Sequence, residues 1–312
     1  MPKISIITPV YNEEATVRHC HAEIRRIMTS LGDGYTYEHI FGDNCSRDRT
    51  LEILREIARE DPHVKVLAYS RNFGAEKSGV TLLRHASGDA VVGVVADLQE
   101  PPELIPRMVE LWEQGNDMVL GIYENHSDGW FKKRVRSMYY RLASWVSNEE
   151  LERNTTGYGL LDRRVVDILA DMDDYAPYVR GWLTTMGFRK AWFHYQRRPR
   201  TAGESKHGYS FLMDFGLNAL ISYSILPIRL ATYLGLTLSG LSLLLSVVYA
   251  CIKLWKWNFQ APGATTTIVL VLFFSGIQLL FLGILGEYIG AIHAQVRRKP
   301  FCLIRERINF ED

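Results

Sequence analysis

The stretch of sequence that decides the fold is Val91-Val92-Gly93-Val94-Val95-Ala96-Asp97-Leu98-Gln99-Glu100-Pro101-Pro102. It begins as an almost continuous apolar run, which is typical of a strand buried on both faces of a parallel sheet. Two prolines at its end prevent the strand from continuing. Asp97 and Gln99 follow the apolar run directly, and in an open parallel sheet the carboxyl ends of the strands form the edge that binds ligands.

The side chains of Asp97 and Gln99 suit a hard cation. One carboxylate and one amide are oxygen ligands of the kind that Mg²⁺ or Mn²⁺ prefers, with substrate phosphates completing the coordination. We therefore expect a divalent cation at this position. An ordinary polar turn after a strand has the same pattern, and this stretch alone leaves both interpretations open.

The composition of the chain narrows the possible classes of function. Its 312 residues are enough for more than one folded unit. The formal net charge is +1, without the basic excess that is typical of nucleic-acid binding, so we expect no nucleic-acid partner. The four cysteines are scattered with no C-x-x-C spacing, which favours a reducing compartment over a zinc site or a disulfide framework. The N-terminus runs directly into a strand pattern, and no signal peptide is expected.

Strand and helix patterns alternate over about the first 120 residues. Short strands are expected at residues 4–10, 39–42, 64–68 and 118–121, besides the one that opens at Val91. Helices are expected to end near residues 29, 60, 85 and 114. This alternation predicts an α/β fold, a mostly parallel sheet with helices on both faces. The first turn, residues 9–14, has no G-x-G-x-x-G pattern, which counts against a dinucleotide-binding Rossmann domain.

Polar side chains follow four of the predicted strands. These groups are Tyr11 with Asn12 and Glu13, Asp43, Arg71 with Asn72, and Asp97 with Gln99. Each group taken singly is best explained as turn or capping residues. Four groups on one edge of a sheet favour a small-molecule site instead.

Two segments have the composition of helices that lie at a membrane surface. Residues 128–146 mix aromatic and basic side chains, and residues 209–222 are apolar on most of one face. A solvated charged face over an aromatic core stripe is the alternative for the first segment. The basic loop 197–206 lies between them, where it fits either a phosphate or headgroup site or a plain basic linker.

Two uncharged stretches, residues 230–252 and 265–286, each exceed the ~20 residues that a transmembrane helix needs. A buried helix pair of a soluble protein is the alternative. Basic residues flank the hairpin, which predicts that both ends are cytosolic. We expect a cytosolic domain over residues 1–223 that includes the interfacial helices. A two-span hairpin is expected over 224–296, with helices at about 230–252 and 265–288. A cytosolic tail is expected over 297–312. The whole is then a multi-pass protein of the inner (plasma) membrane.

Motifs along nearly the whole chain resemble those of family-2 glycosyltransferases of the polyisoprenyl-phosphate type. They are Pro-Val-Tyr-Asn-Glu-Glu at 9–14, Ser-Arg-Asn-Phe-Gly at 70–74, Ala-Asp-Leu-Gln at 96–99, Ala-Gly-Glu-Ser-Lys at 202–206, Leu-Pro-Ile-Arg-Leu-Ala at 226–231 and Gly-Ile-Leu-Gly-Glu-Tyr-Ile-Gly at 283–290. The resemblance implies a GT-A fold. It also implies metal-dependent, inverting transfer of a sugar from a UDP- or GDP-sugar to a polyprenyl phosphate at the cytosolic face of the bilayer.

The resemblance also implies roles for particular residues. Those expected to bind the nucleotide are Pro9, Tyr11, Asn12, Glu13, Asp43, Asn72 and Ala96. Asp97 and Gln99 would hold the metal. Residues expected beside the lipid phosphate are Lys133, Arg134, Ser137 and Lys206. The catalytic set would be Asp97, Lys133, Arg134 and Arg200.

Three departures from the family pattern weigh on this assignment. The usual Asp-Ala-Asp is Val95-Ala96-Asp97, and the usual Asp-Asp-Gly is Asp43-Asn44-Cys45. Tyr158 stands where the family often has an Asp that is considered a catalytic base. A catalytically degenerate membrane scaffold or partner of a glycan-assembly complex is therefore the alternative function.

The missing base does not by itself exclude an enzyme. The second pKa of a phosphate monoester is about 6, so the acceptor oxygen is already largely ionised at neutral pH and little proton needs to be removed. Glycines in the two predicted spans, such as Gly235 and Gly283, permit close contact between helices, and we expect a homo-oligomer, either a dimer or a tetramer.

Overall fold

The computed structural model describes residues 1–123, 155–175, 177, 179–198, 226–255, 263–297 and 300–310. The chain divides into two units, Met1–Gly208 with Lys299–Asp312, and Tyr209–Arg298. The two predicted interfacial helices, near residues 128–146 and 209–222, lie outside the described residues.

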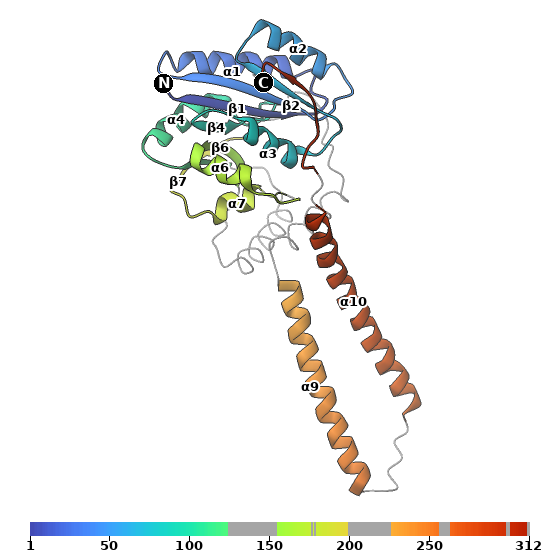
Figure 1. The fold of residues 1–312 in the computed structure, drawn as a ribbon. Helices are drawn as coiled ribbons and strands as arrows, with labels where there is room; N and C mark the ends of the chain where they lie inside the picture. The colour runs from blue at the N-terminus through green and yellow to red at the C-terminus, as the bar shows by residue number, and fades with distance from the viewer. Residues whose placement is uncertain are drawn as a thin grey trace. The chain divides into compact units, whose positions relative to one another are not determined.

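The first unit is built on one mixed sheet whose strand order is β7-β5-β6-β4-β1-β2-β3-β8 (Figure 1). The strands are β1 (Lys3–Val10), β2 (Thr36–Asp43), β3 (Val64–Tyr69), β4 (Ala90–Gly93), β5 (Met118–Tyr123), β6 (Thr155–Asp162), β7 (Lys190–Tyr195) and β8 (Ile304–Ile308). β4, β1, β2 and β3 run parallel to one another, and β7 runs parallel to β5. β6 is antiparallel to both β4 and β5, and β8 is antiparallel to β3.

Helices cover both faces of the sheet (Figure 1). On one face lie α1 (Val17–Ser30), α2 (Thr50–Glu60) and α4 (Ile105–Glu113), which follows a short 3₁₀ turn at Pro102–Leu104. On the other lie α3 (Ala75–His85), α6 (Arg163–Asp171) and α7 (Val179–Thr185). Successive side chains of each strand point to opposite faces of the sheet. Ile6, Val92 and Leu160 belong to the core beneath α1 and α4, while Ile7, Val91 and Leu161 line a pocket beneath α3 and α7.

The predicted α/β fold with helices on both faces is confirmed, but the sheet is mixed rather than mostly parallel. Three of its seven strand pairings are antiparallel, and the local sequence of a strand does not encode the direction of its partner. The apolar run from Val91 was expected to be one strand to Ala96, yet β4 ends at Gly93. Residues 163–164 begin α6, because Asp162 caps that helix by accepting the Arg164 N–H at 3.0 Å.

The segment at 297–312, expected as a tail, adds the edge strand β8 to the sheet. Ile308 pairs with Val66 and Ile304 with Tyr69. The N–H of Ser70 donates to the carbonyl of Leu303 at 2.9 Å. This strand was missed because its signal is only five residues long, with isoleucines at 304 and 308 as the alternating apolar positions.

The second unit contains two long apolar helices, α9 (Leu226–Trp255) and α10 (Ala264–Val296). Within the described part of the chain, one segment, Phe273–Val296 of α10, is long and apolar enough to cross a membrane. Large apolar side chains on both helices are exposed in the chain, for example Leu244 and Leu279. Exposed apolar surface of this extent indicates a partner or a lipid environment. The crossing expected for α9 stays a prediction.

Candidate active site

The loops that follow β1, β2 and β3 are joined to one another at the carboxyl edge of the sheet. The N–H of Asn12 donates to Ser46 Oγ at 2.9 Å, and the N–H of Arg47 donates back to Asn12 Oδ1 at 2.8 Å. The N–H of Phe73 donates to Asn44 Oδ1 at 3.3 Å. Because β1, β2 and β3 are parallel neighbours, these bonds make one continuous rim from three separate loops.

Three residues in the loops at this edge of the sheet have a left-handed backbone. The φ angles are 53° at Asn12, 60° at Cys45 and 50° at Leu98. Among the described residues other than glycine, only Asn309 also has a positive φ. Such a conformation is costly for a side chain as bulky as leucine, and strained residues of this kind concentrate at functional sites. The strain therefore marks the loops after β1, β2 and β4 as the candidate site.

Asp43 is a fully buried carboxylate at the end of β2. Its two oxygens accept the N–H of Ser46 at 3.2 and 3.3 Å. Burial raises the pKa of Asp43 above its ordinary value, and the hydrogen bonds from Ser46 and the charge of Arg305 act against that rise. A ligand that donates a hydrogen bond to this carboxylate compensates part of the burial cost, which suits the nucleoside role expected for Asp43.

Asp97 and Gln99 are partly buried in the loop after β4. The N–H of Gln99 donates to Asp97 Oδ1 at 3.3 Å. Backbone bonds fix the loop at both ends: the N–H of Val94 donates to the carbonyl of Ile7 at 2.9 Å, and the N–H of Arg198 donates to the carbonyl of Gln99 at 2.9 Å. The sheet thereby holds these two side chains at the same edge as Asp43.

Glu13 and Asp97 lie close to the first turns of α1. Burial, together with the charges of Asp97 and Glu13, raises the pKa of the Cys20 thiol on α1 to about 12. Thr16 Oγ1 donates to Glu13 Oε2 at 2.7 Å and orients that carboxylate. The charges of these two predicted site carboxylates, 84 positions apart in the sequence, therefore both act on the thiol of Cys20.

The side chains at this edge of the sheet fit a cation that is bound jointly by the protein and by the phosphates of a ligand. The described residues contain no cluster of three or more His, Cys, Asp or Glu side chains that could hold a metal by themselves. Asp97 and Gln99 supply one carboxylate and one amide, and Mg²⁺ is commonly bound by one or two carboxylates plus substrate phosphates. We therefore expect tight metal binding only together with a diphosphate.

The remaining predicted residues fall into two groups. Pro9 and Tyr11 are at or just beyond the end of β1, and Asn72 lies on the rim, where its Oδ1 accepts the N–H of Gly74 at 2.8 Å. The side chain of Ala96 is 4% exposed and packs in the core beside Val10. The residues that lie outside the described part of the chain are Lys133, Arg134, Ser137, Arg200 and Lys206, so the lipid-phosphate assignment stays a prediction.

Tyr158, at the position of the expected base, has a different role here. Its side chain is 2% exposed and packs against Phe193 and Tyr195. Its hydroxyl donates to the carbonyl of Pro101 at 2.6 Å. Burial raises the pKa of Tyr158 far above its ordinary value, so the hydroxyl stays protonated and remains a donor. Tyr158 therefore braces the loop of Asp97 and Gln99 from the core side.

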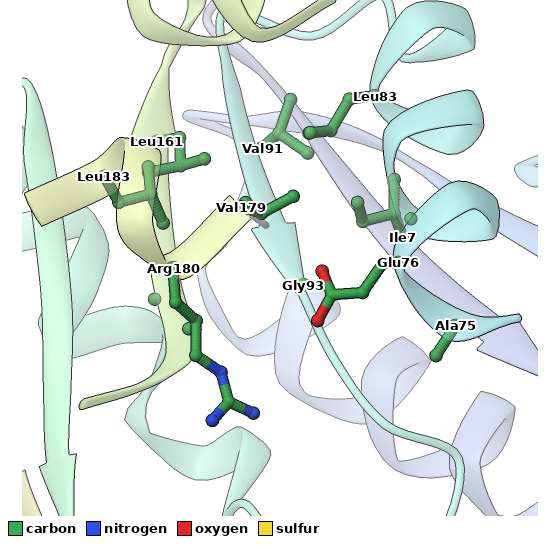
Figure 2. A pocket seen from close by; sticks show the side chains of 13 residues that line it. Ile7, Ala75, Glu76, Leu83, Val91, Gly93, Leu161, Val179, Arg180 and Leu183 are labelled. Atoms are coloured by element: carbon green, nitrogen blue, oxygen red, sulfur yellow. The ribbon is translucent and has the colours of Figure 1, made fainter. Parts of the chain in front are cut away.

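No sequence pattern indicated the pocket on the α3 face of the sheet. Glu76 of α3 and Arg180 of α7 are among its lining residues, with Gly93 of β4 between them (Figure 2). Glu76 lies in an ordinary amphipathic helix, and Arg180 follows a segment without any recognised motif. Their proximity depends on the packing of α3 and α7, which no local pattern reveals.

Comparison with known proteins finds matches over most of the chain. Residues 5–175 match the family described as glycosyl transferase family 2, and residues 226–292 match the GtrB C-terminal hairpin. An uncharacterized glycosyltransferase, YkcC of Bacillus subtilis, is 34% identical over 309 residues, covering 99% of this chain and 95% of the relative. The SfII prophage-derived bactoprenol glucosyl transferase of Shigella flexneri is 33% identical over 305 residues, covering 97% and 98%.

A solved structure is also similar in part. Glucosyl-3-phosphoglycerate synthase from Mycobacterium tuberculosis, in complex with Mn²⁺, UDP and glucosyl-3-phosphoglycerate, has a TM-score of 0.49 and 20% identity. The match covers 70% of this chain and 78% of that one.

Proposed function

This chain belongs to glycosyl transferase family 2, and from that premise we propose that it transfers a sugar from a nucleotide-sugar to a polyprenyl phosphate at the cytosolic face of a membrane. The match to the hairpin family and the relatives named bactoprenol glucosyl transferases support a polyprenyl acceptor. Glucose is the first sugar to test, because those relatives are named for it.

The observation that carries the proposal is the shared edge of the sheet. Asp43 and the Asp97–Gln99 pair stand at the ends of β2 and β4, with the strained loop after β1 between them. A nucleoside diphosphate has a hydrogen-bonding end and an anionic end. The buried carboxylate of Asp43 suits the first end, and the cation-binding pair suits the second.

A divalent cation bound there would neutralise the diphosphate that leaves the sugar. Asp97 and Gln99 would bind that cation, and the loops after β1 and β2 would bind the nucleoside. We assign the acceptor phosphate to Lys133, Arg134, Ser137 and Lys206, with Arg200 offsetting charge in the transition state. The ionised acceptor attacks the anomeric carbon in one displacement, which inverts its configuration. Because that acceptor is already largely ionised, a base at position 158 would have little to remove.

The hydrophobic hairpin fits a lipid-linked acceptor. We assign α9 and α10 to two membrane crossings, with residues 1–223 and 297–312 cytosolic, so that the loops on the sheet edge and the lipid phosphate are reached from one side. The inner membrane is the location we propose, and a dimer or tetramer formed through the small residues of the spans is the proposed assembly.

The test uses the full chain purified in detergent and added to vesicles that contain undecaprenyl phosphate. Release of nucleoside diphosphate from UDP- and GDP-sugars is measured with Mn²⁺, with Mg²⁺ and with a chelator. We expect turnover that needs both the cation and the lipid. Asp97→Ala is expected to lower the turnover rate at least ~10²-fold. Asp167→Ala, which removes an exposed carboxylate on α6, is expected to leave the turnover rate unchanged.

Two results would contradict the proposal. Nucleotide-sugar binding without turnover on any polyprenyl phosphate would favour the scaffold alternative. Wild-type rates for Asp97→Ala would show that the cation site is elsewhere.

A further inference from the structure

We propose that the pocket between α3, β4, β6 and α7 binds the sugar ring of the nucleotide-sugar, with Glu76 and Arg180 recognising its hydroxyl groups (Figure 2). The inference rests on the proposed function, because it names the part of the donor that this pocket takes. It assigns a role to two residues that no motif in the sequence marked.

The pocket lies at the correct edge of the sheet. Gly93, the last residue of β4, lines it four positions before Asp97. β6 runs antiparallel to β4 with Val92 opposite Leu160, so Gly157, three residues before Leu160, lies toward the same carboxyl edge. The pocket, on the α3 face of the sheet, therefore shares the carboxyl edge of β4 with Asp97, where the proposed diphosphate would be held.

The pocket has the size of one ring. Its volume is about 170 Å³, and cavities of roughly 150 Å³ accept a benzene-sized ring. Glycines keep it open: a Cβ added at Gly79 or at Gly93 would meet nothing within 4 Å. At Gly157, which has a φ of +83°, a Cβ would lie 3.6 Å from Arg180 Cγ. Missing side chains let a ligand approach the backbone closely.

The polar groups of the pocket match a polyol. Glu76 extends from α3 toward Gly93, and Arg180 extends from α7 on the other side of the pocket (Figure 2). A carboxylate accepts hydrogen bonds and a guanidinium donates them, while each sugar hydroxyl does both. Apolar side chains, among them Ile7, Val91 and Leu183, supply the walls that the C–H surface of a sugar contacts.

The charge balance favours a neutral ligand over a phosphate. Burial raises the pKa of Glu76, and the nearby charge of Arg180 and a hydrogen bond from the Val179 N–H oppose that rise. The carboxylate would repel a phosphate group placed in the same small space. A hydroxyl-bearing ring instead satisfies Glu76 and Arg180 without adding charge, so the lipid phosphate belongs elsewhere.

The experiment measures kcat/KM for the nucleotide-sugar and the Kd of the nucleoside diphosphate alone, on the full chain. Glu76→Gln keeps the shape of the side chain but removes its charge, and is expected to lower kcat/KM by roughly 10–100-fold with the Kd within about twofold of wild type. Gly79→Ala places a methyl group in the pocket and is expected to lower kcat/KM with the same unchanged Kd. Gly34→Ala, at an exposed glycine that also has nothing within 4 Å, is the matched control.

The outcomes separate the two proposals. Gly79→Ala replaces a helix-interior glycine by the best helix former, so a loss of turnover with an unchanged melting curve reports the pocket and not misfolding. If the wild type is active and both pocket variants keep its kcat/KM, the pocket does not bind the sugar, while the proposed function stands. If the wild type turns over no nucleotide-sugar, both fall together. A parallel loss of nucleoside diphosphate affinity would also overturn the sugar assignment.

Discussion

Replacing Tyr158 by phenylalanine removes one hydroxyl from a side chain that joins the core to the candidate cation loop. That hydroxyl donates to the carbonyl of Pro101 at 2.6 Å, two residues after Gln99. The ring itself is 2% exposed among Phe193 and Tyr195. The substitution therefore leaves the ring in place and deletes the short hydrogen bond to the carbonyl of Pro101.

The expected cost follows from the burial of the two partners. A neutral hydrogen bond contributes about 0.5–1.5 kcal/mol net, and an orphaned buried acceptor raises the cost. Pro101 is only partly buried, so water can reach its carbonyl when the hydroxyl is gone. We expect Tyr158→Phe to lower the free energy of unfolding by about 1–1.5 kcal/mol, which lowers Tm by about 2–6 °C for a domain of this size.

The assay is the thermal unfolding of the full chain in detergent, followed by titration with a nucleoside diphosphate and Mn²⁺. Tyr37→Phe is the matched control, because Tyr37 is partly buried on β2, stacks on His63 and lies outside the loop of Asp97 and Gln99. We expect the loosened loop of Tyr158→Phe to bind the metal–nucleotide pair several-fold more weakly. Equal Tm and equal affinity for the two variants would refute the bracing role of Tyr158.

Three further predictions concern the cation, the packing of β6 and the pH dependence of stability. Asp97→Asn is expected to abolish the stimulation of nucleoside diphosphate binding by Mn²⁺ in calorimetry, and unchanged stimulation would exclude Asp97 as a ligand. Gly159→Ala puts a Cβ far too close to the carbonyl oxygen of Val119, so we expect the free energy of unfolding, measured in urea, to fall by more than ~2 kcal/mol. An almost unchanged free energy of unfolding would show that β5 and β6 do not pack this closely. Burial holds the pKa of His39 well below its ordinary value. The unfolded chain therefore takes up the extra proton as the pH falls through about 6.5, and stability present above that pH is lost below it, by about 1.4 kcal/mol at pH 5.5. His39→Gln should make the free energy of unfolding depend less on pH between about 5.5 and 6.5. An unchanged pH dependence in this variant would contradict the assignment to His39.

The edge of the sheet was predictable because its signals are local. Each parallel strand is an apolar run that stops at a polar group, and the rule that ligands bind at the carboxyl ends then brings Asp43 and Asp97 together without any further information. The direction of β6 and the partner of β8 depend on contacts between distant segments. A five-residue strand beginning at Ile304 carries too little pattern to reveal that it pairs with β3.

The pocket on the α3 face shows the same limit within the site. The glycines at 79, 93 and 157 are scattered in the sequence, and each has an ordinary local explanation in a helix, a strand end or a turn. Only the packing of α3 and α7 on the sheet brings them beside Glu76 and Arg180. Sequence patterns report periodicity along one element, whereas a cavity depends on the distances between elements.

The pairing of β8 with β3 has a consequence for how the protein is made. The strand follows α9 and α10 in the chain, so a ribosome must synthesise both apolar helices before the edge of β3 is covered. Until then the nascent sheet exposes unpaired backbone groups, and exposed edges promote association between chains. A protein truncated after α10 would keep that edge bare permanently, and we expect it to aggregate during production even though every residue of β1 to β7 is present.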